Sequence, residues 1–247
     1  MATNFAVLLP GLFMTGTIIN ITAIIGGSVI GLFFGARLSD QLKSTLISGM
    51  GLFLIAMGFQ MFLKTENSLI VLGALIAGTL LGEWWRIEDG LHKLGTLLEH
   101  KFSREEDDGS NRFVRGFLTA SLLFCIGPIA ILGSIQDGLT GDFNLLVVKS
   151  VIDGFASIAF ASALGIGVAF SSLIILVYQG GISLLAGQLN AIVTTSMMNE
   201  LTATGGILLI GIGFSNLLEI KKIRVGNMLP SLVIAPLIVW VIVFFQK

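Results

Sequence analysis

The sequence predicts an all-α polytopic membrane protein that crosses a lipid bilayer about eight times. Of its 247 residues, 54% are hydrophobic and 12% are charged, with a mean hydropathy of +0.95, whereas a soluble domain carries about 25% charged residues. Several apolar runs are long enough to span the hydrocarbon core. The runs are continuous rather than alternating, and an open strand cannot satisfy its backbone in lipid, so we expect helices.

An internal repeat is the third observation behind this fold class. Residues 46–64 and 201–219 are identical at seven of 19 positions with an offset of 155, and Gly26-Gly27 recurs as Gly180-Gly181 with an offset of 154. Self-similarity at one spacing is typical of a duplicated chain. We therefore expect a single membrane domain, 1–247, with the following parts: a first repeat (12–83), a cytoplasmic amphipathic helix and acidic loop (84–112), a central helix pair (113–170) and a second repeat (171–247).

The apolar runs give the spans in order. The clear ones are 12–35, 45–63, 68–81, 113–135, 201–218 and 228–245. The stretch 145–187 is too long for one crossing, and we divide it near 165–172 into two further spans. From Trp84 to Phe102, apolar residues recur every three or four positions, which predicts an amphipathic helix lying along the membrane surface.

The basic residues favour eight spans, or seven plus a re-entrant hairpin. With the N-terminus outside, 11 of the 14 Lys and Arg residues lie on the cytoplasmic side, and only Lys64, Lys149 and Lys247 lie outside, in keeping with the positive-inside rule. This topology inverts the second repeat relative to the first. Inverted repeats are the architecture of many secondary transporters, whose sites lie near the midplane between the repeats.

Four phrases carry a family resemblance. They are ASLLFCIGPIAILGSIQDG (120–138), KSVIDGFASIAFA (149–161), MNELTATGG (198–206) and KIRVGNMLP (222–230). The chain resembles, over nearly its whole length, the YqgA/YdfK-like family, a domain of unknown function. The resemblance implies a multi-pass protein of the bacterial inner membrane. It implies no activity, substrate or catalytic residue, so function has to be inferred from the residues.

Glu200 is the first candidate for an ion site, because carboxylates in apolar helices are costly and usually face a cavity or a partner. The candidate set around it is Asn199, Glu200, Thr202 and Thr204. Gly205-Gly206 follows, and we expect it to break the helix and free backbone carbonyls. Carboxylate, hydroxyl and carbonyl oxygens suit Na⁺ or H⁺. In the alternative interpretation, Asn199 or Glu200 only caps the helix.

Other candidates lie in the central helices. Asp153 is a second ion ligand, or else the partner of Lys149 in an ion pair on the helix surface. Gly127-Pro128 interrupts the span that contains Cys125, because proline removes a helix hydrogen bond. The break either presents bare backbone groups to an ion or is a simple kink. Gln136 and Asp137 form a pathway mouth or end the helix. Asn20 is a ligand or an interhelical hydrogen-bonding group, and Gln179 is more typical of the latter.

Composition argues against several functions. The net charge is −1, which gives no reason to expect a nucleic-acid partner, and the single Cys125 rules out an intramolecular disulfide. His92 and His100 both lie in the surface helix, and the sequence has no metal-ligand cluster, phosphate-binding loop or nucleophile elbow. We therefore expect no enzymatic activity, no resident metal and no cofactor other than a bound Na⁺.

The leading functional prediction is a secondary transporter of a small solute or ion, coupled to Na⁺ or H⁺ by alternating access. An ion channel lined by the same polar residues is one alternative, and a membrane scaffold that transports nothing is another. A membrane-embedded enzyme is a third, but it needs an acid/base pair that only Glu200 with Asp153 could supply. Gly27, Gly31 and Gly35 recur at four-residue spacing in the first span. Such small residues allow close helix approach, so this face could join two copies of the chain.

Overall fold

The chain folds into a bundle of helices, which confirms the predicted all-α fold class. The computed structural model describes residues 14–102, 110–190 and 192–245, and every regular element in those ranges is helical. Within these ranges, seven helices are long and apolar enough to cross a membrane, and a bent helix pair gives an eighth span if it crosses as one. The elements in order are α1 (Thr15–Gly35), α2 (Asp40–Phe62), α3 (Ser68–Trp85), α4 (Ile87–Phe102), α5 (Ser110–Cys125), α6 (Pro128–Thr140), α7 (Asn144–Leu164), α8 (Gly167–Leu184), α9 (Ala186–Asn190), α10 (Thr195–Ile212), the π-helical turn η1 (Gly213–Leu217), the 3₁₀ turn η2 (Val225–Met228) and α11 (Ser231–Phe245).

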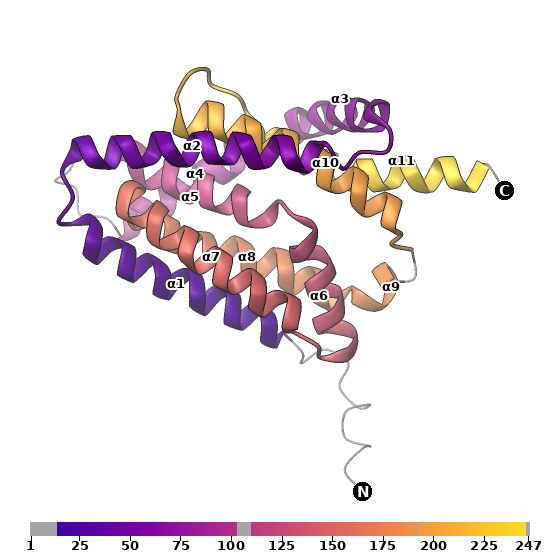
Figure 1. Ribbon diagram of the computed structural model, residues 1–247, viewed down its shortest axis with the longest axis horizontal. Helices are drawn as coiled ribbons and strands as arrows, with labels where there is room; N and C mark the ends of the chain where they lie inside the picture. The colour runs from indigo at the N-terminus through magenta and orange to yellow at the C-terminus, as the bar shows by residue number, and fades with distance from the viewer. Residues whose placement is uncertain (1–13, 103–109, 191, 246–247) are drawn as a thin grey trace, which may run out of the picture.

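The long helices form two groups (Figure 1). In the first, α1 packs on α7 and α8, and α8 also packs on α5 and α6. In the second, α10 packs on α2 and α11, and α11 packs on α3. The groups meet where α2 contacts α7 and where α10 contacts α5 and α6. The bent pair α5–α6 carries the chain from the end where α3 finishes to the end where α7 begins, so it acts as one crossing (Figure 1).

The glycine face of α1 is used within the chain. A methyl group at Gly27, Gly31 or Gly35 would lie within 3.0 Å of a backbone carbonyl oxygen of α7. These three glycines face Gly154, Ile158 and Ser162 in that order. The residue numbers increase in the same direction on both helices, so α1 and α7 run parallel. The expectation that this face joins two copies of the chain has to be corrected, because α7 already covers it.

The packing of α2 on α10 bears on the predicted repeat. Shifted by 155, the bounds of α2 coincide with Thr195–Leu217, which is α10 continued by η1. A Cβ at Gly58 would meet the carbonyl oxygen of Gly206 and the reverse, and Gly213 approaches the carbonyl of Gly51 in the same way. The offset of 155 relates Gly58 to Gly213 and Gly51 to Gly206, so it converts one contact into the other. The order of the contacts shows that α2 and α10 run antiparallel. These features support an inverted repeat, which stays an interpretation of the sequence.

Two predicted breaks are present and both depend on glycine. Gly127 adopts φ 153°, and there the axes of α5 and α6 bend by 66°. Gly165 adopts φ 84° and separates α7 from α8, where we expected the long apolar run to divide. Side chains other than glycine rarely adopt such φ values, so each position fixes the point at which a helix ends.

Two other predictions about helix ends are wrong. α10 continues through Gly205 and Gly206, because both pack against other helices and Gly206 lies directly on the backbone of α2. The departure from α-helix comes at η1 instead. Gln136 and Asp137 do not end the helix either, since α6 runs to Thr140.

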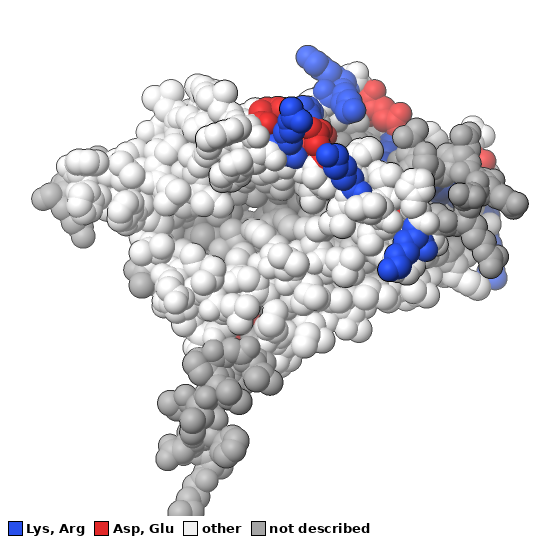
Figure 2. Space-filling view, turned by 180° about the vertical axis from the view of Figure 1, so that it is seen from behind, with Lys and Arg blue, Asp and Glu red and all other residues white. Residues whose placement is uncertain are grey.

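The predicted amphipathic helix is α4, which follows the left-handed residue Arg86 and packs on α5 and η2. Figure 2 shows most charged side chains of the displayed face along its upper and right-hand parts, while most of its remaining described surface is white. Large apolar side chains such as Leu52, Phe155 and Val177 are exposed on the long helices. A membrane protein presents such a surface to lipid.

Candidate functional site

Four polar side chains from three helices meet inside the first group. They are Asn20 of α1, Lys149 and Asp153 of α7, and Gln179 of α8, and all are buried. Asn20 Nδ2 donates to Asp153 Oδ2 at 3.0 Å and to Gln179 Oε1 at 3.3 Å. Lys149 forms an ion pair with the same Asp153 oxygen. The central cluster, as we call these four residues, joins one carboxylate, one ammonium and two carboxamides.

The central cluster brings together residues that the sequence presents separately. The predicted pairing of Lys149 with Asp153 is confirmed, but the pair is buried rather than on the helix surface. Asn20 Oδ1 and Gln179 Nε2 have no hydrogen-bond partner among the described residues. Because buried polar atoms are nearly always paired, the protein groups described here satisfy the central cluster only in part.

The broken span lies beside this cluster. Lys149 Nζ is 5.8 Å from the ring centroid of Phe124, which belongs to the last turn of α5. Gly127, the residue before α6, supplies no side-chain cap. The end of α5 carries partial negative charge from its free carbonyls, which favours a nearby ammonium. Half-helices that end within a membrane protein in this way commonly border transport sites.

Asp137 lies at a second buried position, on α6. Its Oδ2 accepts a hydrogen bond of 3.0 Å from the backbone N–H of Gly16, at the start of α1. Asp137 is fully buried, whereas its neighbour Gln136 is exposed. Asp137 therefore caps a helix 121 residues away in sequence. Of the two residues predicted to form a pathway mouth, only Asp137 is buried, and Gln136 points to the surface.

Glu200 is held by the turn between α2 and α3. Its Oε2 accepts from the Thr65 hydroxyl at 2.7 Å, and its Oε1 accepts from the backbone N–H groups of Glu66 at 2.7 Å and Asn67 at 3.0 Å. The cap of α10 is Thr194, so the idea that Glu200 caps its own helix is wrong. The carboxylate instead fastens α10 to another turn, and three donors already surround its two oxygens.

The other candidates near Glu200 do not converge on one point. Asn199 Nδ2 donates to Glu66 Oε1 at 2.7 Å in an exposed contact, and Thr202 Oγ1 donates to the carbonyl of Met198 at 2.6 Å. Thr204 is buried, and its hydroxyl has no partner in the part of the chain that the structure describes. These contacts favour a structural role for Glu200 over an ion site.

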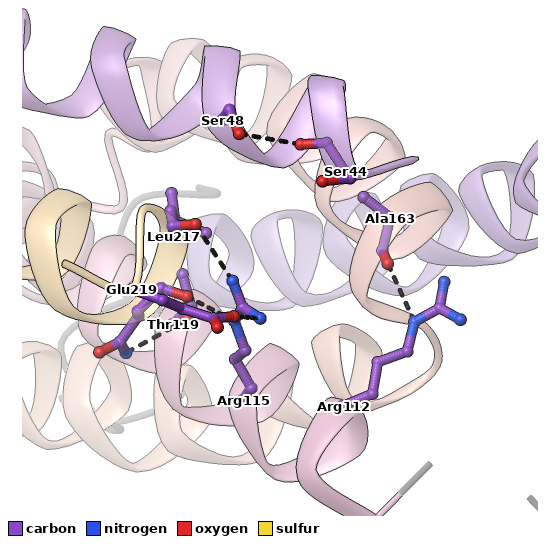
Figure 3. Close-up of polar contacts among 9 residues, drawn as sticks. Ser44, Ser48, Arg112, Arg115, Thr119, Ala163, Leu217 and Glu219 are labelled. Carbon is purple, nitrogen blue, oxygen red and sulfur yellow. Dashed lines mark hydrogen bonds and ion pairs between the residues drawn. The ribbon is translucent and has the colours of Figure 1, made fainter. Parts of the chain in front are cut away.

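Arg115 makes several polar contacts that the sequence patterns did not predict. Its guanidinium, on α5, donates to the carbonyl oxygens of Asn216 and Leu217 and pairs with Glu219 (Figure 3). Asn216 Nδ2 also donates to Thr119 Oγ1 at 3.2 Å. A cation on the last carbonyls of η1 is favourable because it meets the negative end of the helix. The available signal was a lone arginine early in an apolar span.

The α4 end of the molecule carries a third set of contacts, outside the membrane spans. Burial raises the pKa of Glu88, although its Oε2 accepts from the backbone N–H of Gly226 at 2.8 Å. A hydrogen bond from Arg224 lowers the pKa of Asp89, and the same arginine contacts Glu83. Among the residues described, no three His, Cys, Asp or Glu side chains are grouped to hold a metal ion.

Comparison with known proteins gives one family. Residues 15–240 match the family model described as "Protein of unknown function (DUF554)". The chain is 36% identical over 233 residues to "Uncharacterized membrane protein YdfK" of Bacillus subtilis, covering 93% of this chain and 97% of that protein. It is 30% identical over 221 residues to "Uncharacterized protein YqgA" of Escherichia coli, covering 89% and 94% respectively. No solved structure matches the chain.

Proposed function

This chain belongs to the DUF554 family of proteins of unknown function, so its activity must be inferred from its own residues, and we propose that it is a secondary transporter coupled to Na⁺ or H⁺. The observation that carries the proposal is the central cluster, where a carboxylate, an ammonium and two carboxamides are buried between α1, α7 and α8. A buried ion pair adds little stability compared with apolar packing. Ionisable groups at such positions mark ion and substrate pathways.

Asp153 is the ion-binding group in this proposal, and Lys149 is an internal cation that occupies it between transport events. Na⁺ or a proton arriving at Asp153 competes with Lys149 for the carboxylate, and Asn20 Oδ1 offers a second hard oxygen. The displaced ammonium lies beside the end of α5. Ion binding is thereby linked to the broken span, which is the element best able to change its angle.

Alternating access further requires that two ends of the molecule open in turn. The rod formed by α10 and η1 is held near its start by Glu200 on the α2–α3 turn and at its end by Arg115 on α5. These contacts lie at opposite ends of one rod that touches both helix groups. In the proposed cycle, one contact opens while the other stays closed.

The test combines binding with flux. Purified protein should unfold at a higher temperature in Na⁺ than in choline at fixed ionic strength, or should show a matching dependence on pH, because a ligand that binds only the folded state stabilises it. Asp153→Asn should weaken this response, because the central cluster no longer binds the cation, and should lose flux in proteoliposomes. Asp40→Asn is the matched control, since the Asp40 side chain is 98% exposed. Lys149→Gln should bind the cation more tightly than the wild type.

Single-channel recording separates the rival functions. A substrate-independent conductance that does not saturate would contradict the transporter and favour a channel. A protein without cation response or flux in any of these assays would contradict both and favour a scaffold.

A further inference from the structure

Asp137 is a buried carboxylate whose charge is not balanced by any basic side chain in the described ranges. It is fully buried and takes part in none of the ion pairs found there. α6 packs chiefly on α1, α7, α8, α9 and α10. The ionisable side chains on those helices are Lys149, Asp153, Tyr178 and Glu200, and Lys149 is already paired with Asp153.

The N-terminus of α1 compensates this charge only in part. The N–H of Gly16 donates to Asp137 Oδ2 at 3.0 Å, and the backbone N–H of Thr17 also faces the carboxylate. A helix N-terminus is equivalent to roughly half a positive charge. Asp137 Oδ1 accepts no hydrogen bond from any described residue. An ionised carboxylate in an apolar interior is costly enough that it takes up a proton or a cation instead.

Two buried hydroxyl groups without hydrogen-bond partners belong to residues that neighbour this contact along α1 and α6. Thr17 follows Gly16 on α1, and Ser134 lies one turn before Asp137 on α6. Both are fully buried, and neither hydroxyl has a partner within 14–102, 110–190 and 192–245. Carboxylate and hydroxyl oxygens are hard ligands that suit Na⁺, and they can equally relay a proton.

Two helices connect the surroundings of Asp137 with the central cluster. On α1, Asn20 comes four residues after Gly16, which is about 6 Å along the helix axis. On α8, Gln179 comes one turn before Ser183, whose hydroxyl donates to the carbonyl of Ser134 at 3.0 Å. The surroundings of Asp137 and the central cluster therefore lie one helical turn apart on the same helix faces.

We infer that Asp137, Thr17 and Ser134 form a second cation site, which binds Na⁺ or a proton and passes it to Asp153. The binding stands on the local geometry alone, while the transfer to Asp153 rests on the proposed function.

The experiment uses the full chain carrying Asp153→Asn, so that the central cluster gives no cation signal. NaCl replaces choline chloride at fixed ionic strength while unfolding temperature is measured, and the infrared band of a protonated carboxyl group is recorded in choline. We expect a saturable rise with Na⁺, or a protonated carboxyl band, and its loss on adding Asp137→Asn. Asparagine keeps an oxygen for the N–H of Gly16, and the exposed Gln136→Ala serves as the control.

A second variant guards against misfolding. Thr17→Val removes one hydroxyl and should weaken the apparent Na⁺ affinity at least about tenfold, as loss of a supporting group at a cation site does. If the site takes a proton, the same change should shift the carboxyl band. The site is overturned if Asp137→Asn and Thr17→Val both match the Asp153→Asn parent in unfolding and in the infrared spectrum.

Flux measurements separate this site from the proposed function. A cation response that depends on Asp137, in a protein whose wild type shows no flux, keeps the site and overturns transport. Wild-type flux that Asp137→Asn leaves unchanged overturns the transfer from Asp137 to Asp153. Flux that falls while the wild-type level of binding at Asp153 is retained supports the transfer.

Discussion

Replacing Glu200 by glutamine should destabilise the protein without touching any ion site. Glu200 is 1% exposed, and its two oxygens accept three hydrogen bonds from the turn between α2 and α3. Glutamine has almost the same shape but carries no charge and keeps only one accepting oxygen. The change therefore isolates the charge and one acceptor from the packing of the side chain.

The magnitude follows from the three bonds. A hydrogen bond to a charged group contributes about 1.5–3 kcal/mol and a neutral one about 0.5–1.5 kcal/mol, so each bond should lose about 1–1.5 kcal/mol and the three together about 3–4.5 kcal/mol. For a chain of this size, that loss lowers the unfolding temperature by about 6–18 °C. Glu66→Gln is the matched control, because its exposed contact with Asn199 survives the change and surface substitutions cost about 0.5 kcal/mol or less.

The assay is thermal unfolding of the purified protein in detergent, in Na⁺ and in choline at equal ionic strength. We expect Glu200→Gln to lower the unfolding temperature equally in both salts. An unchanged unfolding temperature would refute the assignment of Glu200 as a structural fastener. A loss that appears only in Na⁺ would restore the ion site that the sequence suggested.

Three further predictions concern other contacts. Gly31→Ala should cost about 1–3 kcal/mol of stability by forcing α1 from α7, whereas Gly26→Ala, with open space around its Cβ, should be neutral or stabilising; thermal unfolding compares them. Arg115→Lys should lose about 1–3 kcal/mol of stability, because an ammonium cannot reproduce the contacts that the guanidinium makes with Asn216, Leu217 and Glu219. Arg112 contacts one carbonyl oxygen, so Arg112→Lys should lose less stability in denaturant unfolding. Burial raises the pKa of Glu88 above its ordinary value of 4.5, so the folded state binds this proton more tightly than the unfolded state. The stability from this group is therefore present at low pH and is lost as pH rises through the pKa of Glu88 in the folded protein. The free energy of unfolding, measured from pH 4.5 upward, should decline, and Glu88→Gln should flatten that decline.

Local features of the sequence were sufficient to predict most of the helices and two of their breaks. Gly127-Pro128 and Gly165 interrupt helices because of backbone chemistry that each residue carries with it. The amphipathic period of α4 is equally local. Gly205-Gly206 was misread because a glycine pair can either loosen a helix or allow close packing. Which of these happens depends on the helix opposite, and the sequence around the pair does not name that helix.

The contacts of the candidate residues could not be predicted in the same way. Glu200 reaches a turn 133 to 135 residues away, and Asp137 reaches a helix start 121 residues away. Lys149 with Asp153 was predictable because the pair lies one turn apart on a single helix. Asn20 and Gln179 join them only through the packing of α1 and α8 on α7, which brings together three segments distant in sequence.

The number of hydrogen bonds at each buried carboxylate distinguishes a structural from a functional role. Glu200 receives three donors on two oxygens, so a further cation would have to displace protein groups that hold the fold together. Asp153 receives an ammonium and an amide on one oxygen, and that ammonium is the kind of partner a mobile cation can replace. Asp137 faces the backbone N–H groups of Gly16 and Thr17 and no basic side chain among the residues described. In an apolar surrounding the cost of a charge rises as its partners decrease. Under the proposed function, we therefore expect affinity for an incoming cation to increase from Glu200 through Asp153 to Asp137, with Asp137 taking the ion first and Asp153 exchanging it.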